Sequence, residues 1–543
     1  MIVLAILAFI FGLGLIILIH ELGHFIFAKK AGILCYEFSI GMGPALYRKK
    51  KGETTYAIRC IPIGGYVSMA GEQVADSLIK VGDNVGLNFS EGKISEIVLD
   101  LNEECECRGE VVSFDLYDAL GNGLFVQIKD GEEEKTFEAF PDACYVMAGG
   151  NEKNRQWRRM QISSYERSFE SKKLLPRFLT ISFGPIMNFL LAIVLCFIVG
   201  LAIGKPDYSK TVIGEISGPA SLVVNEETKE TKLMKNDEIL SIDGVSVSTW
   251  NELSNRLDEL VGKEEITFEV KRKDETIEVK INPMVFVGNL GVYGTANAGS
   301  EIGVPVNLYI TNAEKAGIKN NDYIRSVDGQ EVTSWSQIIT ICENISEARR
   351  VEVVLDRPEF DDNGNVVYVD GVIQYKEKGK VVTVEFFEDK VLNGIGVEKI
   401  SQRIGISPKC HTNFLFALQY SFTGMWDSVV SVFNTLGLLF SSSQVGVSDL
   451  SGPVGIFSMI ESSVSQGFVD YLALLAMLSV NIGIVNLLPI PALDGGRLVF
   501  LAYEGITRKK PNKKFENILN SIVFILLMIL FVYVTFNDIL RLG

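Results

Sequence analysis

Histidine is scarce in this sequence, and its cysteines follow no metal-binding or disulfide spacing. Only three histidines and eight cysteines occur in 543 residues, and no two cysteines form a CxxC pair. The cysteine spacing therefore excludes a finger-type zinc site and gives no sign of a disulfide framework. Cys105 and Cys107 offer two thiolates, but no nearby residues complete a tetrahedral site.

The sequence also lacks an excess of basic residues. Lys and Arg number 51 against 67 Asp and Glu, which gives a net charge of −16 and a pI of about 4.9. Phosphate binding needs a basic face, so nucleic acid is excluded as a partner. Hydrophobic residues make up 47%, with 22% charged residues and a mean hydropathy of +0.24. This mixture predicts a multidomain protein in which a few membrane helices join soluble modules.

Charge is absent from the N-terminal run between Ile2 and Ile19. A helix of this length spans a bilayer core of about 30 Å at about 1.5 Å per residue. The run lacks the basic start and small-residue cleavage site of a secretory signal, so we expect a retained membrane helix.

Four segments are long and apolar enough to span a membrane, at about 2–28, 176–203, 470–490 and 516–536. Lys and Arg cluster after the first, before the second, and between the third and fourth, where RKKPNKK occupies 508–514. The positive-inside rule puts these clusters in the cytoplasm. Both termini and the long region after the second span are then extracytoplasmic.

Strand patterns dominate the region after the first span. TTYAIRCIPI (54–63) alternates polar and apolar residues, which is typical of a hairpin. Two interpretations stay open: a plain cytoplasmic hairpin, or a hairpin folded against the membrane helices with an edge free to pair with a substrate. The following residues predict a soluble, β-rich cytoplasmic insert.

An internal repeat lies in the outer region. KNDEILSIDGVSVSTW (235–250) returns as NNDYIRSVDGQEVTSW (320–335). Each copy predicts a strand, an Asp-Gly turn and a second strand, which resembles the centre of a PDZ domain of the bacterial protease type. We expect two tandem PDZ-like domains, which either contact a peptide or act as a structural spacer.

The fold class predicted is a polytopic α-helical membrane protein with about four transmembrane helices, a membrane-associated hairpin, a cytoplasmic β-rich insert and two PDZ-like domains. The predicted segments are the first transmembrane helix (1–36), the hairpin (37–75), the insert (76–170), the second transmembrane helix (171–204), the PDZ-like domains (205–290 and 291–400), an amphipathic outer-surface helix region (401–450), the third transmembrane helix (451–505) and a basic loop with the fourth (506–543).

The motif His20-Glu21-Leu22-Gly23-His24 is HExxH, set in the first span. Residues four apart share one face of a helix, so His20 and His24 are able to bind one zinc ion, with Glu21 beside them as a base. Two buried histidines satisfied by other helices are the alternative. That alternative leaves the buried acid unexplained, since a charge at membrane depth is costly.

A third ligand is needed, because a catalytic zinc takes three protein ligands and keeps one position open. The apolar region 411–443 is expected to be a helix at the outer surface, with a fifth span as the alternative, and His411 at its start is expected to be an ordinary surface residue. In NLLPIPALDGGR (486–497) two prolines break a spanning helix, and Asp494 follows them. We predict Asp494 as the third ligand, although it would alternatively cap the next helix. Asn486 is predicted to position substrate.

HELGH, GPIMNF (184–189) and the pattern from Asn486 to Gly495 together resemble the site-2 protease family, and the two PDZ-like copies resemble its bacterial, sigma-factor-regulating branch. The resemblance implies a Zn²⁺-dependent endopeptidase that cleaves inside a substrate's transmembrane helix, near the cytoplasmic side. It implies a multi-pass protein of the bacterial inner (plasma) membrane, and single-span substrates such as anti-sigma factors and remnant signal peptides. An upstream site-1 protease trims such substrates first.

Two other functions share some of these features. A membrane zinc carrier also needs membrane histidines and acids, but it does not need a glutamate beside a three-ligand site. A non-catalytic PDZ scaffold does not need His20, Glu21, His24 and Asp494 together.

Overall fold

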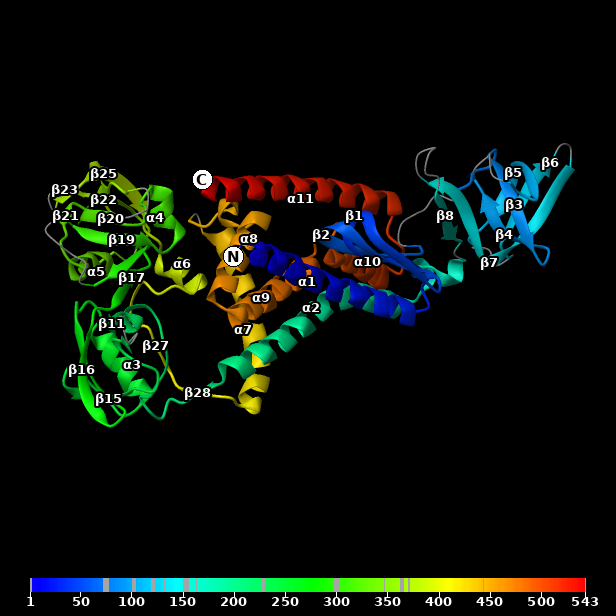
Figure 1. Ribbon diagram of the computed structural model, residues 1–543. Coiled ribbons are helices and arrows are strands. Elements are labelled where there is room, and N and C mark those ends of the chain that lie inside the picture. The colour runs from blue at the N-terminus through cyan, green and yellow to red at the C-terminus, as the bar shows by residue number, and fades with distance from the viewer. Residues whose placement is uncertain are drawn as a thin grey trace. The chain divides into compact units, whose positions relative to one another are not determined.

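The structure is a computed structural model of the chain, and it describes residues 2–542 apart from 72–77, 100–103, 119–122, 131–132, 150–155, 163, 226–229, 297–302, 346, 362–365, 370–371 and 443. The chain divides into two compact units, and Figure 1 labels their helices and strands. Unit 1 comprises Met1–Cys196, Ser421–Val429 and Ser451–Gly543, and unit 2 comprises Phe197–Tyr420 and Val430–Leu450.

Among the described residues, four helices are long and apolar enough to cross a membrane. They coincide with the four predicted spans: α1 (Ile2–Lys30), α2 (Leu174–Ile203), α9 (Phe468–Leu487) and α11 (Lys513–Leu542). The predicted segment 451–505, which carries the third span at about 470–490, contains three helices: α8 (Pro453–Gln466), α9 and α10 (Asp494–Thr507). Gly467, at φ +153°, separates α8 from α9.

The break between α9 and α10 follows from its prolines. Pro489 and Pro491 have no backbone N–H to continue the ladder of α9, which ends at Leu487. The turn then passes through Ala492, whose φ of +72° is rare for a residue with a Cβ. Asp494 is the first residue of α10, and Leu493 is its N-cap, so Asp494 does not cap the helix.

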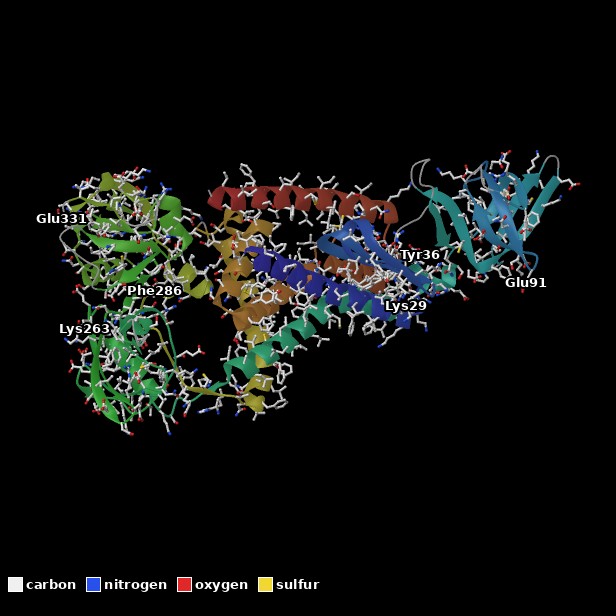
Figure 2. The ribbon with its side chains drawn as sticks, viewed as in Figure 1. Lys29, Tyr36, Glu91, Lys263, Phe286 and Glu331 are labelled. Carbon is white, nitrogen blue, oxygen red and sulfur yellow. The ribbon has the colours of Figure 1, made fainter. Side chains whose placement is uncertain are left out.

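The predicted hairpin is formed by β1 (Cys35–Lys51) and β2 (Thr54–Met69). Bulges bend it so that the start of β1, residues 37–40, lies between residues 55–58 and residues 65–68 of β2. Lys29, labelled in Figure 2, donates to Glu53 in the hairpin turn at 2.6 Å, and Arg167 donates to the other carboxylate oxygen at 2.6 Å. This ion-pair group fixes the far end of the hairpin to the end of α1.

The predicted β-rich insert is a six-stranded sheet in the order β4-β3-β5-β6-β7-β8. A parallel pairing of β4 with β7 closes five of the strands into a ring around an apolar core that includes Leu87, Ile97, Val126 and Ile128. The strands are β3 (Asn84–Ser90), β4 (Lys93–Val98), β5 (Cys107–Asp115), β6 (Phe125–Asp130), β7 (Glu133–Gly149) and β8 (Gln156–Gln161).

The internal repeat corresponds to two similar sets of elements in unit 2. The first copy has the sheet β14-β13-β15-β16 with α3, and the second has β21, β20, β22 and β25 with α5. The first set is β13 (Glu238–Ile242), β14 (Val245–Ser246), α3 (Trp250–Glu259), β15 (Ile266–Arg272) and β16 (Glu275–Ile281). The second set is β20 (Asp322–Val327), β21 (Gln330–Glu331), α5 (Trp335–Glu343), β22 (Arg350–Pro358) and β25 (Tyr375–Glu385).

The second copy is inserted into the first. β9 (Lys205–Pro206) and β10 (Ile213–Ile216) pair with β28 (Cys410–His411) and β27 (Ile406–Pro408), about 200 residues later. The second sheet continues from β20 through β19 (Val304–Leu308), β18 (Val292–Thr295) and β17 (Met284–Val287) to β26 (Ile400–Arg403). The predicted boundary at 290/291 therefore falls inside this sheet, and the predicted helix region at 401–450 begins with strands. Its helix is α7 (Phe414–Ser441).

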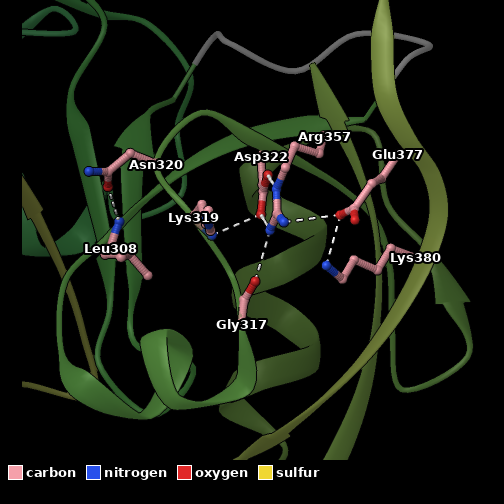
Figure 3. Close-up of polar contacts among 8 residues, drawn as sticks. All are labelled: Leu308, Gly317, Lys319, Asn320, Asp322, Arg357, Glu377 and Lys380. Carbon is pink, nitrogen blue, oxygen red and sulfur yellow. Dashed lines mark hydrogen bonds and ion pairs between the residues drawn. The ribbon is translucent and has the colours of Figure 1, made fainter. Parts of the chain in front are cut away.

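A buried ion pair supports each copy. In the second, Arg357 donates to both carboxylate oxygens of Asp322 at 2.8 Å and to the carbonyl of Gly317 (Figure 3). Hydrogen bonding to Asp322 raises the pKa of Arg357. In the first copy, Arg272 contacts Asp237 in the same way, at 2.7 Å.

We expect Arg357→Met to lower the free energy of unfolding of the second copy by about 3–5 kcal/mol. The Asp322 side chain is 1% exposed and would lose its cation. The change is measured by unfolding the purified chain in denaturant, with the protease sensitivity of unit 2 as the readout. Arg256→Met is the control, since its partner Glu259 is 65% exposed. Equal and small effects of both substitutions would contradict this prediction.

Candidate active site

Helix α1 brings the predicted motif residues to one face. His20 and His24 are one helical turn apart in a mostly apolar helix. They are 8% and 9% exposed. Their rings lie edge to face, and their Nε2 atoms are 3.2 Å apart. The two nitrogens therefore point at one common position.

Asp494 reaches the same position from the start of α10. Its Oδ2 lies 3.2 Å from Nε2 of His20 and 3.3 Å from Nε2 of His24. This oxygen is buried, and the two histidine nitrogens are its polar neighbours. Within the described part of the chain, no other group of three His, Cys, Asp or Glu side chains converges in this way.

The three donor atoms fit a tetrahedral metal ion. Metal–ligand bonds of about 2.0–2.1 Å at tetrahedral angles separate the ligand atoms by about 3.3–3.4 Å. The observed separations are 3.2, 3.2 and 3.3 Å. Two nitrogens and one carboxylate oxygen form a donor set that zinc accepts, and three protein donors leave a fourth position free.

Two cavities meet at this cluster. One, of about 290 Å³, reaches the three metal-ligand candidates and Arg497, and the other, of about 400 Å³, extends among apolar side chains such as Leu13, Ile482 and Phe531. The residues that line both cavities are His20, Glu21, Gly65 and Asn486. The predicted base and the predicted substrate-binding residue thus share the space in front of the cluster.

Comparison with known proteins gives one consistent result over the whole chain. The sequence pattern of Peptidase family M50 matches residues 8–530. Zinc metalloprotease RasP of Shouchella clausii is 30% identical over 99% of both chains. Regulator of sigma-W protease RasP of Bacillus subtilis is 29% identical over the full length of both, and the putative zinc metalloprotease SACOL1281 of Staphylococcus aureus is 29% identical over 99% of this chain and 98% of its own length.

The chain belongs to peptidase family M50. Membership in this family, which contains the site-2 proteases, confirms the predicted peptidase activity, and the names of the full-length relatives confirm the zinc requirement. Four apolar helices and this family make the chain an integral membrane protein. Nothing in the site or the comparisons favours the zinc carrier or the scaffold.

The close approach of α1 to α2 in this M50 chain depends on two glycines. A Cβ on Gly23 would lie 2.1 Å from the carbonyl oxygen of Phe183, and a Cβ on Gly184 would lie 2.2 Å from Nε2 of His24. Neither position has room for a side chain. Gly184 belongs to the GPIMNF motif, whose place next to the HExxH helix the sequence did not reveal.

Helix α2 also contacts the outer nitrogen of each histidine. Nδ1 of His24 lies 2.8 Å from the carbonyl oxygen of Thr180, and Nδ1 of His20 lies 3.4 Å from the Asn188 amide. When Nε2 faces a metal, Nδ1 carries the proton and needs an acceptor. The Oδ1 atom of Asn188 is buried without a partner. Turning the Asn188 amide by 180° exchanges its oxygen and nitrogen, and Oδ1 then accepts the hydrogen bond of His20 Nδ1. Ser479 holds the Asn188 backbone by donating to its carbonyl at 2.8 Å.

Strand β2 lines part of the smaller cavity through Gly65, Tyr66, Val67 and Met69. Gly65 fits closely against Glu21, since a Cβ there would lie 2.9 Å from Cγ of Glu21. The hydroxyl of Tyr66 accepts from Arg59 at 2.6 Å and donates to Glu37 at 2.9 Å. Burial and then Glu37 raise the pKa of Tyr66.

The sequence missed Thr180, Asn188 and Ser479 as neighbours of the site. Thr180 acts through a backbone carbonyl, which carries no sequence signal. Asn188 did carry a sequence signal, because an amide in an apolar span is a candidate functional group. His411 is in β28 of unit 2 and is not a member of the converging group.

Proposed function

We propose that this chain is an intramembrane zinc endopeptidase with His20, His24 and Asp494 as the metal ligands and Glu21 as the catalytic base. The observation that carries the proposal is the convergence of three donor atoms at separations of 3.2–3.3 Å, at a cavity that Glu21 also lines. The family of the chain and its apolar helices support hydrolysis within the membrane.

The chemistry divides between the metal and the chain. Zinc, when bound, acts as a Lewis acid that acidifies water and polarises a carbonyl oxygen. Glu21 takes the proton of the attacking water and returns it to the leaving amine. Asn486 donates to the substrate backbone from the wall of the same cavity, and Asn188 and the Thr180 carbonyl keep the two imidazoles oriented.

The substrate binds in extended form along β2. Residues 65–68 pair with 37–40 on one side, and their other edge has no strand partner among the described residues. This edge belongs to the wall of the smaller cavity. A helical substrate shields its own carbonyls, so local unwinding and addition as a further strand expose the scissile bond.

The membrane orientation follows the basic residues. Lys29 and Lys30 end α1, and the basic segment 508–514 connects α10 to the first residues of α11, so these ends face the cytoplasm of a bacterial cell. His20 and His24 then lie toward the cytoplasmic side of the plasma membrane, and the two copies of unit 2 are extracytoplasmic PDZ-like domains.

Substrates are single-span membrane proteins of the anti-sigma-factor type and remnant signal peptides. One full-length relative is named a regulator of sigma-W protease, which supports this class. An upstream site-1 protease removes the outer part of the substrate. The PDZ-like copies then admit only trimmed substrates.

The test uses the purified chain in detergent with one single-span substrate, either intact or without its outer domain. We expect cleavage inside the apolar segment of the trimmed form, located by product mass, and slower cleavage of the intact form. A zinc chelator should stop the reaction. A cut outside the apolar segment would overturn the intramembrane assignment, and equal rates for both forms would overturn selection by the outer domains.

A further inference from the structure

The turn that carries Asp494 has an unfavourable backbone conformation. Ala492, two residues before Asp494, adopts a φ of +72°. For a residue with a Cβ this left-handed region is unfavourable and usually needs support from neighbouring groups. Inside the turn, the N–H of Leu493 donates to the carbonyl oxygen of Ile490 at 3.2 Å. The N–H of Ala492 takes no part in that bond.

Support for Ala492 comes from the last helix. Its N–H donates to Oδ1 of Asn520, on α11, at 3.0 Å. Both residues line a third cavity, of about 740 Å³, that also contains Arg497. The bond therefore crosses from α11 to the turn immediately before the third metal-ligand candidate.

Helix α11 is otherwise loosely packed in the described structure, since only 6% of its most apolar stretch is buried against the rest of the chain. A second polar contact of α11 with the core is at its far end, where Asp538 accepts from the N–H of Gly455 in α8 at 2.8 Å. The bond from Asn520 is thus a specific link in a helix that makes little other contact. Hydrogen bonds between helices contribute to helix association in a membrane together with van der Waals packing.

We propose that Asn520 is a positioning residue: by holding the N–H of Ala492 it maintains the left-handed turn that aims Asp494 at His20 and His24. The proposal rests on the proposed role of Asp494 as a metal ligand. It links the fourth transmembrane helix to the metal site through one hydrogen bond.

The test measures zinc affinity by competition with a chelator, together with kcat and KM on a trimmed substrate. Asn520→Leu keeps the side-chain size and removes the acceptor. We expect it to lower zinc affinity by roughly 10- to 100-fold, as loss of a group that orients a metal ligand does, and to lower kcat with KM unchanged. Asn520→Asp retains an acceptor and should stay within about threefold of the native protein.

Two further variants separate this role from helix packing. Asn517→Leu is the matched control, because Asn517 lies one turn away on α11 and lines the same cavity. It should bind zinc as the native protein does. Ala492→Gly added to Asn520→Leu should restore much of the affinity, because glycine adopts the left-handed conformation without support.

Native zinc affinity in Asn520→Leu, or an equal loss in Asn517→Leu, would overturn the proposal. If Asn520→Leu fails to fold, Asn520→Ser takes its place, because the shorter side chain no longer reaches Ala492. Native zinc affinity in Asn520→Ser would overturn the proposal. Asp494→Ala distinguishes the two levels of inference: retained zinc in that variant refutes the ligand assignment itself, whereas lost zinc there with native affinity in Asn520→Leu refutes only the role of Asn520.

Discussion

Glu21→Gln is expected to lower kcat by about 10²–10⁴-fold while leaving bound zinc unchanged. The amide has the shape of the carboxylate but cannot accept the proton of the attacking water. Glu21 is not one of the three converging donors, so its substitution leaves the metal ligands in place. Cleavage of a trimmed single-span substrate and zinc content are measured on the same purified samples.

His24→Ala is the control that separates the two functions of the motif. It removes a ligand and should lose zinc together with activity, whereas Glu21→Gln should lose activity alone. If Glu21→Gln cleaved at the native rate, the assignment of Glu21 as the catalytic base would be wrong. Loss of zinc in Glu21→Gln would instead make Glu21 a structural support of the site.

The spans and the metal-ligand candidates were predictable because their signals are local. A charge-free run about as long as a bilayer core is thick identifies α1. The spacing of His20 and His24 sets them on one helical face whatever the rest of the fold does. Asp494 was identified by a different local signal: two prolines interrupt an apolar segment immediately before an acid. The third ligand candidate therefore needed no knowledge of tertiary structure.

Strand pairing across long separations was not predictable. The Asp-Gly turns revealed both repeat copies, but the pairing of β10 with β27 and of β9 with β28 joins residues about 200 positions apart. Short strands such as β17 have no periodic pattern long enough to assign them to a sheet. For this reason the insertion of one copy into the other, and the boundary between them, emerged only from the structure.

The contacts that hold the metal-ligand candidates in position were not predictable from the sequence either. The Thr180 carbonyl and the N–H of Ala492 are backbone groups, which every residue has. Their importance depends on which side chain faces them across a helix interface. The sequence identifies the groups that bind a metal more readily than the groups that hold those ligands in position.

The helix interface behind His24 gives the second large effect: Gly184→Ala is expected to lower zinc affinity by about 10-fold or more and to reduce cleavage accordingly. The new Cβ would lie 2.2 Å from Nε2 of His24, far inside contact distance. His24 is buried and held at Nδ1 by the Thr180 carbonyl, so the ring has little room to withdraw without leaving Asp494. Zinc competition with a chelator and the cleavage rate are the measurements.

Gly14→Ala is the matched control, because a Cβ at this position in α1 meets nothing within 4 Å. Replacing glycine by alanine inside a helix stabilises that helix by about 1 kcal/mol at either position. Propensity alone therefore predicts a gain for both variants, and a loss confined to Gly184→Ala must come from the contact with His24. Gly23→Ala should act on the same interface by a different route, since its Cβ would lie 2.1 Å from the Phe183 carbonyl and force the two backbones apart. Native zinc affinity in Gly184→Ala would show that α2 does not confine His24, and the metal site would then depend on α1 and α10 alone.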